Sequence, residues 1–572
     1  MLACSAMVAC TNDDVLENNE SPLVNKGNSF LSVNLSMGNP TSRATQNEAF
    51  ENGTADEAKV KQTNVKFLFY DAAGNYVTDG VISNAKDEEL SWTENTTGNN
   101  IERDAAPVIV LGPTKVAPAK VIAILNCNEL ATSCINDKMS MSDTYDIVKN
   151  ATNYQTEAGF VMSNSAYVKD NKVVFAADIA PEQICETAED ALLNPVNIYV
   201  ERVAAKITWE FGDEIEGHVE ENMFLMNSGT ATGDYMVNGA LTQLRVEIVG
   251  VKPNAYNATS SLVKNIGTGT YFENWNSTAN YRSYWAVDAN YTGVEQPAVG
   301  VEPWEYTGGS FTNLNYLTFA GNGEKDKNYG AAGALTFYVN ENTMAAPMVA
   351  PNDKTNATTI LVLGKIYVGK DANTADATLF TYKGGYYTED KYLDIVAGSL
   401  TGFATDPEGK TPLTADDFTW KDDKDKYLYR KVNYQTVVLK PVALVEGKTI
   451  YKKTTTVEGE ETTTTWTAAT LADVQNACSL ETKLYFNGMC YYQIPIQHIY
   501  NDGTEANSLG EYGIVRNHSY QLTLTKLNSI GGAVIDENEP LDHIPGKDKD
   551  YYIAAKLNVL AWRVVSNQNV EL

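Results

Sequence analysis

The stretch Phe30-Leu31-Ser32-Val33-Asn34-Leu35-Ser36-Met37 decides the fold class of this chain. Apolar side chains alternate in it with serine and asparagine, so that one face is apolar and the other is polar. A two-residue period of this kind is typical of a half-buried β-strand. The sequence therefore predicts an early strand with four side chains turned toward a core, namely Leu31, Val33, Leu35 and Met37.

The same period recurs along the chain. It predicts strands at Val65 to Tyr70 and Ser519 to Thr525, and the run Val121 to Leu125 is apolar on both faces, as in a strand covered on both sides. Helical periodicity is short and is best at Asp143 to Ala151 and Ala468 to Cys478. The pattern indicates an all-β fold of β-sandwiches with minor helical insertions.

Composition limits the class of partner. Among 572 residues there are 43 Lys and Arg against 73 Asp and Glu, which gives a formal net charge of −30. A surface this acidic repels phosphate backbones, so we expect no nucleic-acid partner. Hydrophobic residues make up 43% of the chain, enough to build a core. No stretch reaches the roughly 18 uninterrupted apolar residues that a membrane-spanning helix needs.

The beginning of the chain resembles the end of a bacterial lipoprotein signal. Met7-Val8-Ala9-Cys10 is similar to a lipobox and is followed by a polar segment. We expect Cys10 to be acylated, with Cys4 the weaker candidate, and Thr11 to Gly27 to be a tether. The alternative is a frayed terminus with two incidental cysteines.

The five remaining cysteines leave disulfide pairing open. Cys127 with Cys134, or Cys478 with Cys490, would suit an exported protein. Buried free thiols are an equally good account, because five is an odd number and spacing alone establishes no pair.

Catalytic and metal-binding motifs do not occur in the sequence. None of the four histidines lies two or four residues from another, and neither a Gly-x-Ser-x-Gly elbow nor a phosphate-binding loop is found. Asp422, Asp423 and Asp425 lack the spacing of a calcium loop, so a solvated acidic turn is expected. We therefore expect a protein that is not an enzyme and needs no cofactor or metal.

A polar loop follows the first predicted strand. Gly38 to Thr45 is rich in turn-forming residues and contains one basic residue, Arg43. Exposed loops of this kind are preferred sites of proteolysis, so a trypsin-like protease would cut between Arg43 and Ala44. An ordinary first strand with an ordinary loop is the alternative.

The chain ends on another alternating segment, Leu557 to Leu572. Such a strand can complete its own sheet or enter the sheet of another molecule, and the residues alone favour neither. Five of its side chains share one face: Leu560, Trp562, Val564, Val570 and Leu572.

Two other segments bear on the organisation of the chain. Val200 to Trp209 is expected to be a strand near the join between two halves, with the boundary close to residue 210. Lys452 to Trp466 is dominated by threonine, whose branched Cβ favours exposed strands, and is interpreted as a hairpin arm. A disordered linker is the alternative for this second segment.

Four places in the sequence carry a recognisable pattern. They are Cys10; the segment from Leu35-Ser36-Met37 to Ser42-Arg43-Ala44; Val200-Glu201-Arg202-Val203-Ala204-Ala205-Lys206; and a C-terminal set made of Tyr491-Tyr492, Val515-Arg516-Asn517-His518-Ser519-Tyr520-Gln521-Leu522 and Val559-Leu560-Ala561-Trp562-Arg563-Val564. Together they resemble the Bacteroidales fimbrillin family, whose members build type V pili, and within it the shaft subunits of the minor fimbriae. The C-terminal set is the most specific.

The resemblance implies two tandem transthyretin-like β-sandwich domains in a precursor that is exported as a lipoprotein to the outer membrane. Residues 1–10 would end the signal, and 11–43 would be a propeptide that contains the removable first strand. Residues 44–210 and 211–572 would form the two domains, the second ending in a donor strand at 557–572.

The resemblance also implies an assembly mechanism and partners. An Arg-specific or trypsin-like protease would remove the first strand, and the groove would accept the C-terminal strand of the next identical subunit. Accessory tip and anchor subunits would complete a fimbrium that supports adhesion and biofilm formation. A tip adhesin is one alternative; a surface glycan-binding lipoprotein with sugar-stacking aromatics such as Trp275, Trp285 and Trp304 is another.

Overall fold

The computed structural model describes residues 29–38, 56–94, 101–126, 139–141, 144, 159–164, 167–169, 172–174, 176–220, 222–226, 234–254, 262–265, 284–287, 335–340, 342–343, 359–369, 378–433, 435–458, 460–496, 513–514, 516–527, 529–538, 541, 553–560 and 565–569. Strands and the turns between them dominate these residues, and the helices are short, so the predicted all-β class is confirmed. Within the same residues no helix is both long and apolar enough to cross a membrane.

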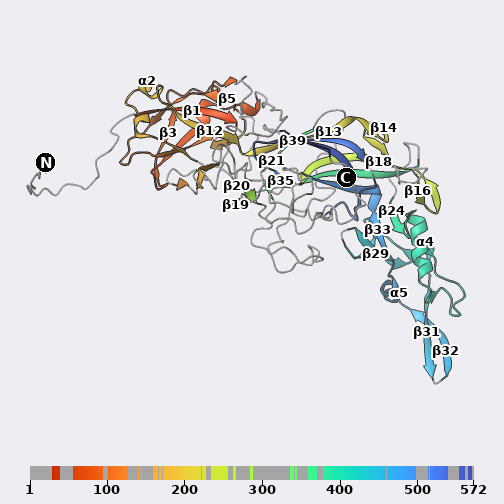
Figure 1. Cartoon of the computed structure of the whole chain (residues 1–572). Coiled ribbons are helices and arrows are strands. Elements are labelled where there is room, and N and C mark those ends of the chain that lie inside the picture. The colour runs from red at the N-terminus through yellow and green to blue at the C-terminus, as the bar shows by residue number, and fades with distance from the viewer. Residues whose placement is uncertain are drawn as a thin grey trace, which may run out of the picture.

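The N-terminal part of the chain forms a ten-stranded sheet (Figure 1). Its order is β12-β8-β7-β2-β3-β6-β1-β5-β4, with β11 beside β7, and β1 also pairs with β12, so the sheet closes on itself. The strands are β1 Ser29–Gly38, β2 Val65–Tyr70, β3 Tyr76–Ile82, β4 Thr93–Glu94, β5 Ile101–Ala105, β6 Val108–Leu111, β7 Lys120–Leu125, β8 Met162–Asn164, β11 Ala177–Asp178 and β12 Val196–Arg202. A hairpin of β9 Tyr167–Lys169 and β10 Lys172–Val174 and the short helix α2 Ala188–Ala191 accompany it.

Alternation explains the core of this closed sheet. The predicted strand Val65 to Tyr70 is confirmed as β2, which turns Phe67 and Phe69 into the interior. The predicted two-sided burial of β7 is also confirmed: Val121, Ala123 and Leu125 face the interior, whereas Ile122 and Ile124 belong to a second cluster on the outer side.

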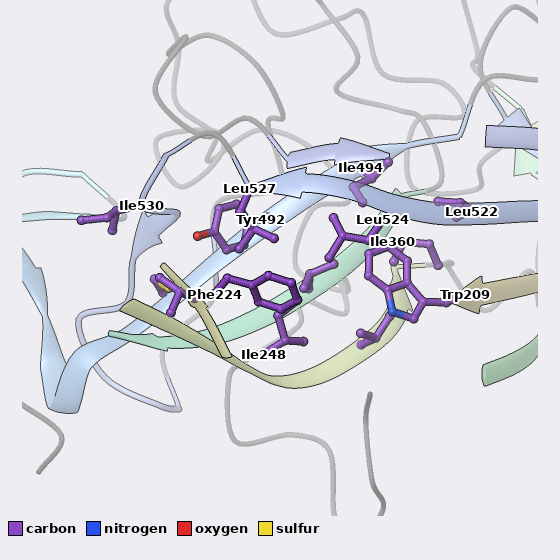
Figure 2. Packing of buried hydrophobic residues seen from close by; sticks show 14 of the residues in the cluster. Trp209, Phe224, Ile248, Ile360, Tyr492, Ile494, Leu522, Leu524, Leu527 and Ile530 are labelled. Atoms are coloured by element: carbon purple, nitrogen blue, oxygen red, sulfur yellow. The ribbon is translucent and has the colours of Figure 1, made fainter. Parts of the chain in front are cut away.

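The C-terminal part contains two sheets packed face to face as a β-sandwich. One sheet has the order β21-β13-β36-β38-β39, with β13 Ala204–Glu216, β21 Leu335–Asn340, β36 Ser519–Leu527, β38 Ile553–Leu560 and β39 Val565–Asn569. The other has the order β14-β15-β18-β23-β34-β37, with β14 His218–Glu220, β15 Met223–Leu225, β18 Leu244–Asn254, β23 Thr359–Val368, β34 Met489–Pro495 and β37 Gly532–Ala533. Buried side chains of both sheets fill the space between them (Figure 2), among them Trp209, Leu522, Leu524, Phe224, Ile248 and Ile360.

A third body with its own apolar core extends from this sandwich (Figure 1). Its main sheet has the order β17-β16-β25-β24-β33-β29-β28, with β16 Tyr235–Val237, β17 Ala240–Thr242, β24 Leu379–Tyr382, β25 Gly385–Thr388, β28 Leu428–Lys431, β29 Thr436–Lys440 and β33 Glu481–Tyr485. Around it lie α4 Glu389–Ser399, α5 Leu471–Ala477, β26 Phe403–Ala404, β27 Phe418–Thr419, β30 Ala443–Leu444, β31 Ile450–Glu458 and β32 Glu461–Ala469. A small separate sheet joins β19 Leu262–Asn265, β20 Tyr284–Val287, β22 Asn342–Thr343 and β35 Gly513–Ile514.

The helices test the periodicity argument. The predicted helix at Ala468 to Cys478 is confirmed as α5, which begins after a capping box at Thr470. Helix α4 is not predicted, although its buried residues repeat with helical spacing at Tyr392, Leu393, Val396 and Ala397. The other predicted helix, Asp143 to Ala151, lies almost entirely outside the described residues.

One predicted strand is wrong in its extent. Val200 to Trp209 is not a single strand, because β12 ends at Arg202 and β13 begins at Ala204 in a different sheet. The sequence hides the break, since Val203 is itself a strong strand former and no glycine or proline marks the change.

Two open questions are decided by the structure. Cys478 and Cys490 are buried free thiols, so the disulfide between them is wrong; Cys127 and Cys134 lie outside the described residues. The threonine-rich segment is the β31–β32 hairpin, which confirms the arm and rejects the disordered linker.

Candidate functional site

The first strand, β1, lies inside the closed sheet and has neighbours along both of its edges. On one edge Ser29 to Ser32 pair with β6, and Leu35 to Gly38 pair with β5. On the other edge Val33 to Met37 pair with β12, which runs parallel to β1, and Phe30 exchanges two backbone hydrogen bonds with Cys185. Removal of β1 would therefore leave unpaired backbone on both sides of a gap.

The predicted core side chains of β1 are where the alternation puts them. Leu31, Val33 and Leu35 are each 0% exposed and belong to the interior cluster of the closed sheet. The backbone of Met37 pairs with Val200 on one side and Arg103 on the other. Burial of large apolar side chains contributes roughly 1.5–3 kcal/mol each, so β1 is a main support of this core.

The polar face of β1 fits its surroundings less well. Ser32 is 0% exposed, and its hydroxyl has no hydrogen-bond partner among the described residues. Asn34 donates a hydrogen bond of 3.3 Å from Nδ2 to Oδ1 of Asn197 on β12. The seat of β1, meaning the gap between β12 on one side and β5 and β6 on the other, is thus well packed around the apolar side chains. On the polar side the hydroxyl of Ser32 lacks a hydrogen bond within the described residues.

Several predicted site residues lie outside the described residues. These are the lipidation residue, the two residues of the cleavage site and four residues of the predicted donor strand: Cys10, Arg43, Ala44, Trp562, Val564, Val570 and Leu572.

The described part of the C-terminal segment belongs to its own sheet. Strand β38 pairs antiparallel with β36, with Leu560 opposite Ser519, and β39 returns along the far side of β38. The predicted donor segment 557–572 is therefore divided, because its first four residues are already paired inside the sandwich.

Two of the quoted sequence patterns meet at the junction between the closed sheet and the sandwich. Arg202, which is 0% exposed, donates hydrogen bonds to the backbone oxygen of Glu57 at 3.0 Å and to Oδ1 of Asn517 at 3.3 Å. Backbone bonds continue the contact, since Asn517 N–H donates to Ala204 and Lys206 N–H donates to His518. The similarity of these patterns to the family was noted from the sequence, but their contact was not predicted.

Buried charges surround this junction. The Glu57 carboxylate lies 3.1 Å from Lys206 Nζ and accepts a 2.8 Å hydrogen bond from the Tyr338 hydroxyl. Glu201 and Arg516 are both buried, and Oε1 of Glu201 lies 3.8 Å from Nε of Arg516. Burial of charge is costly unless it is paired, so the junction requires both parts of the chain to be in register.

The predicted acidic turn is confirmed at Asp422. Its Oδ1 accepts backbone hydrogen bonds from Lys424 and Lys426, and the bond from Lys426 is the main reason that the pKa of this carboxyl is lowered. Among the residues that the structure describes, no group of three or more His, Cys, Asp or Glu side chains could hold a metal ion.

The family of the C-terminal region is decided by a direct match. Residues 483–568, which run from β33 through β34, β36 and β38 into β39, match the family described as major fimbrial subunit protein type IV, fimbrillin, C-terminal. The chain carries a fimbrillin C-terminal region. The resemblance to fimbrillins is thereby supported for residues 483–568, which match the C-terminal region of a major fimbrial subunit family.

Two solved structures of fimbrial proteins are similar to this chain at low identity. A fimbrilin from Porphyromonas gingivalis W83 is 13% identical with a TM-score of 0.33, over 94% of this chain and 98% of that one. The tip fimbrial protein Mfa3 of Porphyromonas gingivalis, with a C-terminal truncation, is 11% identical with a TM-score of 0.24, over 94% and 100%. These TM-scores are too low to carry a structural argument, so the assignment rests on residues 483–568. No curated protein matches the chain.

Proposed function

We propose that this fimbrillin is a shaft subunit of a type V fimbria that is activated by a cut after Arg43 and polymerised by exchange of its C-terminal strand. The observation that carries the proposal is the place of β1 inside the closed sheet, paired along both edges. Arg43 follows five residues after Gly38, the last residue of β1. A cut there would separate β1 from the rest of the chain while leaving its neighbours covalently intact.

Loss of β1 would create a strong acceptor. The space vacated by Leu31, Val33 and Leu35 would expose apolar surface, with the backbone groups of β12 on one side and those of β5 and β6 on the other. A strand that enters the gap covers the exposed apolar surface and pairs the open backbone groups. Its main-chain hydrogen bonds give affinity, and the alternating pockets fix its register. Until the cut, β1 would keep the groove closed and prevent early assembly.

The donor is the segment that follows β38. Leu560 already belongs to that strand, and β39 pairs with β38 alone among the described strands. We therefore place the donated part at residues 561–572, with Trp562, Val564, Val570 and Leu572 as its alternating apolar side chains. Trp562 would be the main anchor, because large aromatic side chains dominate buried contacts of this kind.

This exchange would build a filament from identical subunits. A donor segment and an acceptor groove are different surfaces, so the contact is heterologous and need not close into a ring. The division into residues 44–210 and 211–572 stays a proposal; the change of sheet at Val203 supports two domains, with all of β13, Ala204–Glu216, in the second. Acylation of Cys10 would hold the precursor at the outer membrane, and accessory tip and anchor subunits would share the fimbrium that supports adhesion and biofilm formation.

Limited trypsin treatment of the purified chain, followed by mass spectrometry and negative-stain electron microscopy, tests the proposal. We expect a new terminus at Ala44 and filaments. The Arg43→Ala variant should remain uncut at this position, and a variant without residues 561–572 should be cut; neither should form filaments. Filaments from either variant, or monomers from the cut wild-type chain, would contradict strand exchange.

A further inference from the structure

The β31–β32 hairpin, here called the arm (residues 450–469), projects from the third body of the molecule (Figure 1). Nine consecutive residue pairs join its strands, from Ile450 opposite Ala469 to Glu458 opposite Glu461, without a shift of register. Side chains of its outer half are exposed on both faces, and Val457 is 65% exposed. The outer half of the arm is therefore a two-stranded ribbon that supports no core of its own.

The two edges of the arm are different. At its base β31 is covered by β26, with Phe403 opposite Lys452, whereas β32 pairs with β31 alone in the described part of the chain. Natural proteins protect open edges with lysine, proline, bulges or short strands. The nine residues of β32 contain none of these devices, and their single charge is Glu461 at the tip.

The charges of the arm indicate what covers this edge. Lys452 and Lys453 lie at the base and Glu458, Glu460 and Glu461 lie at the tip, with uncharged residues between them. Lys452 Nζ is held 2.8 Å from Asp473 Oδ1, so Lys453 is the main basic group that the base offers to a neighbour. Two chains of net charge −30 repel each other over most of their surfaces. Two arms placed side by side in opposite directions are an exception, because the acidic tip of each then lies beside the basic base of the other.

The side chains of the edge are also self-complementary. Thr462 to Thr465 are four consecutive threonines, so an antiparallel pairing of two such edges places threonine opposite or diagonal to threonine. Threonine pairs across neighbouring strands are stabilising. We propose that the β32 edges of two copies of this chain pair antiparallel, which joins their arms into one four-stranded sheet.

The contact of a single pair of arms is small and should be weak. In a filament assembled as proposed above, every subunit would present an arm, and many weak contacts would act together to hold neighbouring filaments side by side. This consequence rests on the proposed function, but the pairing itself can be tested on the uncut chain, which does not form filaments by strand exchange.

The test compares lysines introduced on β32, at the proposed edge, with lysines introduced on β31, the neighbouring strand of the arm. In Thr462→Lys/Thr464→Lys the new lysines of two paired copies lie about 5–8 Å apart and repel. In the matched control Thr455→Lys/Val457→Lys the substitutions are at the cross-strand partners of the same residues on β31. There the lysines of the two copies are about three strand spacings apart, roughly 14 Å, beyond the screening length of about 8 Å at physiological salt.

Sedimentation velocity of the full, uncut chain over a concentration series under reducing conditions gives the readout. We expect concentration-dependent dimers of the wild type, association weakened on the order of tenfold in the edge variant, and little change in the control. An equimolar mixture of the edge variant with Thr462→Glu/Thr464→Glu should restore association, whereas each variant alone associates only weakly. Circular dichroism checks that each variant is folded.

Three results would overturn the proposal. A wild-type chain that stays monomeric at every concentration would remove the self-contact and leave the arm free for another kind of partner. Equal weakening by both variants would assign the contact to the face of the arm rather than its edge. Failure of the lysine and glutamate variants to associate when mixed would show that the two edges do not meet.

Discussion

Burial governs the chemistry of the two C-terminal cysteines. It raises the pKa of the Cys478 thiol to about 11 and that of the Cys490 thiol to about 12. A raised pKa keeps each thiol protonated, so the reactive thiolate stays scarce until the pH approaches those values. Cysteine spacing in the sequence could not distinguish this state from a disulfide, because burial depends on strands that are distant in the chain.

We expect both thiols to resist alkylation in the folded protein at pH 8. Iodoacetamide treatment followed by peptide mass spectrometry should find Cys478 and Cys490 unmodified and should find them modified after denaturation. Cys185, which is partly exposed, serves as the internal control and should react in the folded chain. Modification of Cys490 as fast as Cys185 would contradict this account.

Glu57 has a role that its own neighbourhood in the sequence does not signal. It lies in a single 3-10 turn, Asp56–Ala58, within a polar segment, yet its side chain is buried against Lys206 and Tyr338. Those partners come from the C-terminal part of the chain. Polar spacing cannot reveal such a contact, because it joins residues that are about 150 to 280 positions apart in the chain.

Glu57→Ala should lower the free energy of unfolding by about 3–5 kcal/mol, because it removes the 3.1 Å ion pair of the buried Lys206 ammonium. Glu89→Ala is the matched control. Glu89 is 61% exposed at its side chain and forms a 3.7 Å ion pair with Lys59, so its loss should cost less than about 1 kcal/mol. Urea unfolding followed by tryptophan fluorescence measures both, and equal losses would refute the importance of the junction.

At the scale of elements, alternation identified strands but not their partners. It predicted β1, β2, β7 and β36 with nearly their observed bounds, because one or both faces of each are buried. It failed between β12 and β13, where continuous strand-forming residues cross from one sheet to another. Strand β12 pairs with β8, where Val200 is opposite Asn164, and β13 pairs with β36, where Lys206 is opposite Ser519. These partners are distant in the sequence, so local periodicity cannot indicate to which sheet each strand belongs.

The base of the arm also depends on a residue that periodicity ignores. Gly409 has a φ of +73°, and a Cβ at this position would overlap the indole ring of Trp466 on β32. Gly447 has a φ of +81°, but a Cβ there would meet nothing within 4 Å. A side chain at Gly447 would therefore be disfavoured by the backbone conformation alone, whereas a side chain at Gly409 would be disfavoured by both the backbone conformation and a clash with Trp466.

Gly447→Ala should lower the free energy of unfolding by about 1–2 kcal/mol, the cost of a left-handed conformation for alanine. Gly409→Ala should cost a further 1–3 kcal/mol or so, because Trp466 must move as well. Chemical denaturation gives both values, and a change in tryptophan emission is expected for Gly409→Ala alone. Equal values for the two variants would contradict the close packing of Trp466.

At the scale of the whole molecule, the sequence predicted the parts of the site better than their arrangement. The apolar face of β1 was readable because burial enforces a strict period of two on Leu31, Val33 and Leu35. Its parallel pairing with β12, and the bonds of Phe30 to Cys185, were not readable. These contacts join segments separated by most of the N-terminal part, and only the closed sheet brings them together.

A chain that is cut after Arg43 and lacks residues 561–572 should have an empty groove and should be rescued by a peptide of residues 29–38. Binding to the folded state alone stabilises it by mass action, so the melting temperature should rise with peptide concentration. A control peptide with asparagine at Val33 and Leu35 should have no effect. A rise with both peptides, or with neither, would contradict specific seating of β1.

The single residue between β12 and β13 has a mechanical consequence. Strand β12 borders the seat of β1, Val203 alone connects it to β13, and β13 pairs through β36 with β38, from which the C-terminal tail departs. In a filament built by strand exchange, tension would enter each subunit at the seat and leave through the tail along this short route. The one-residue connection between β12 and β13 leaves no flexible segment there that could extend under tension. The arm is not part of this route, so it could contact a neighbour while the filament is under tension.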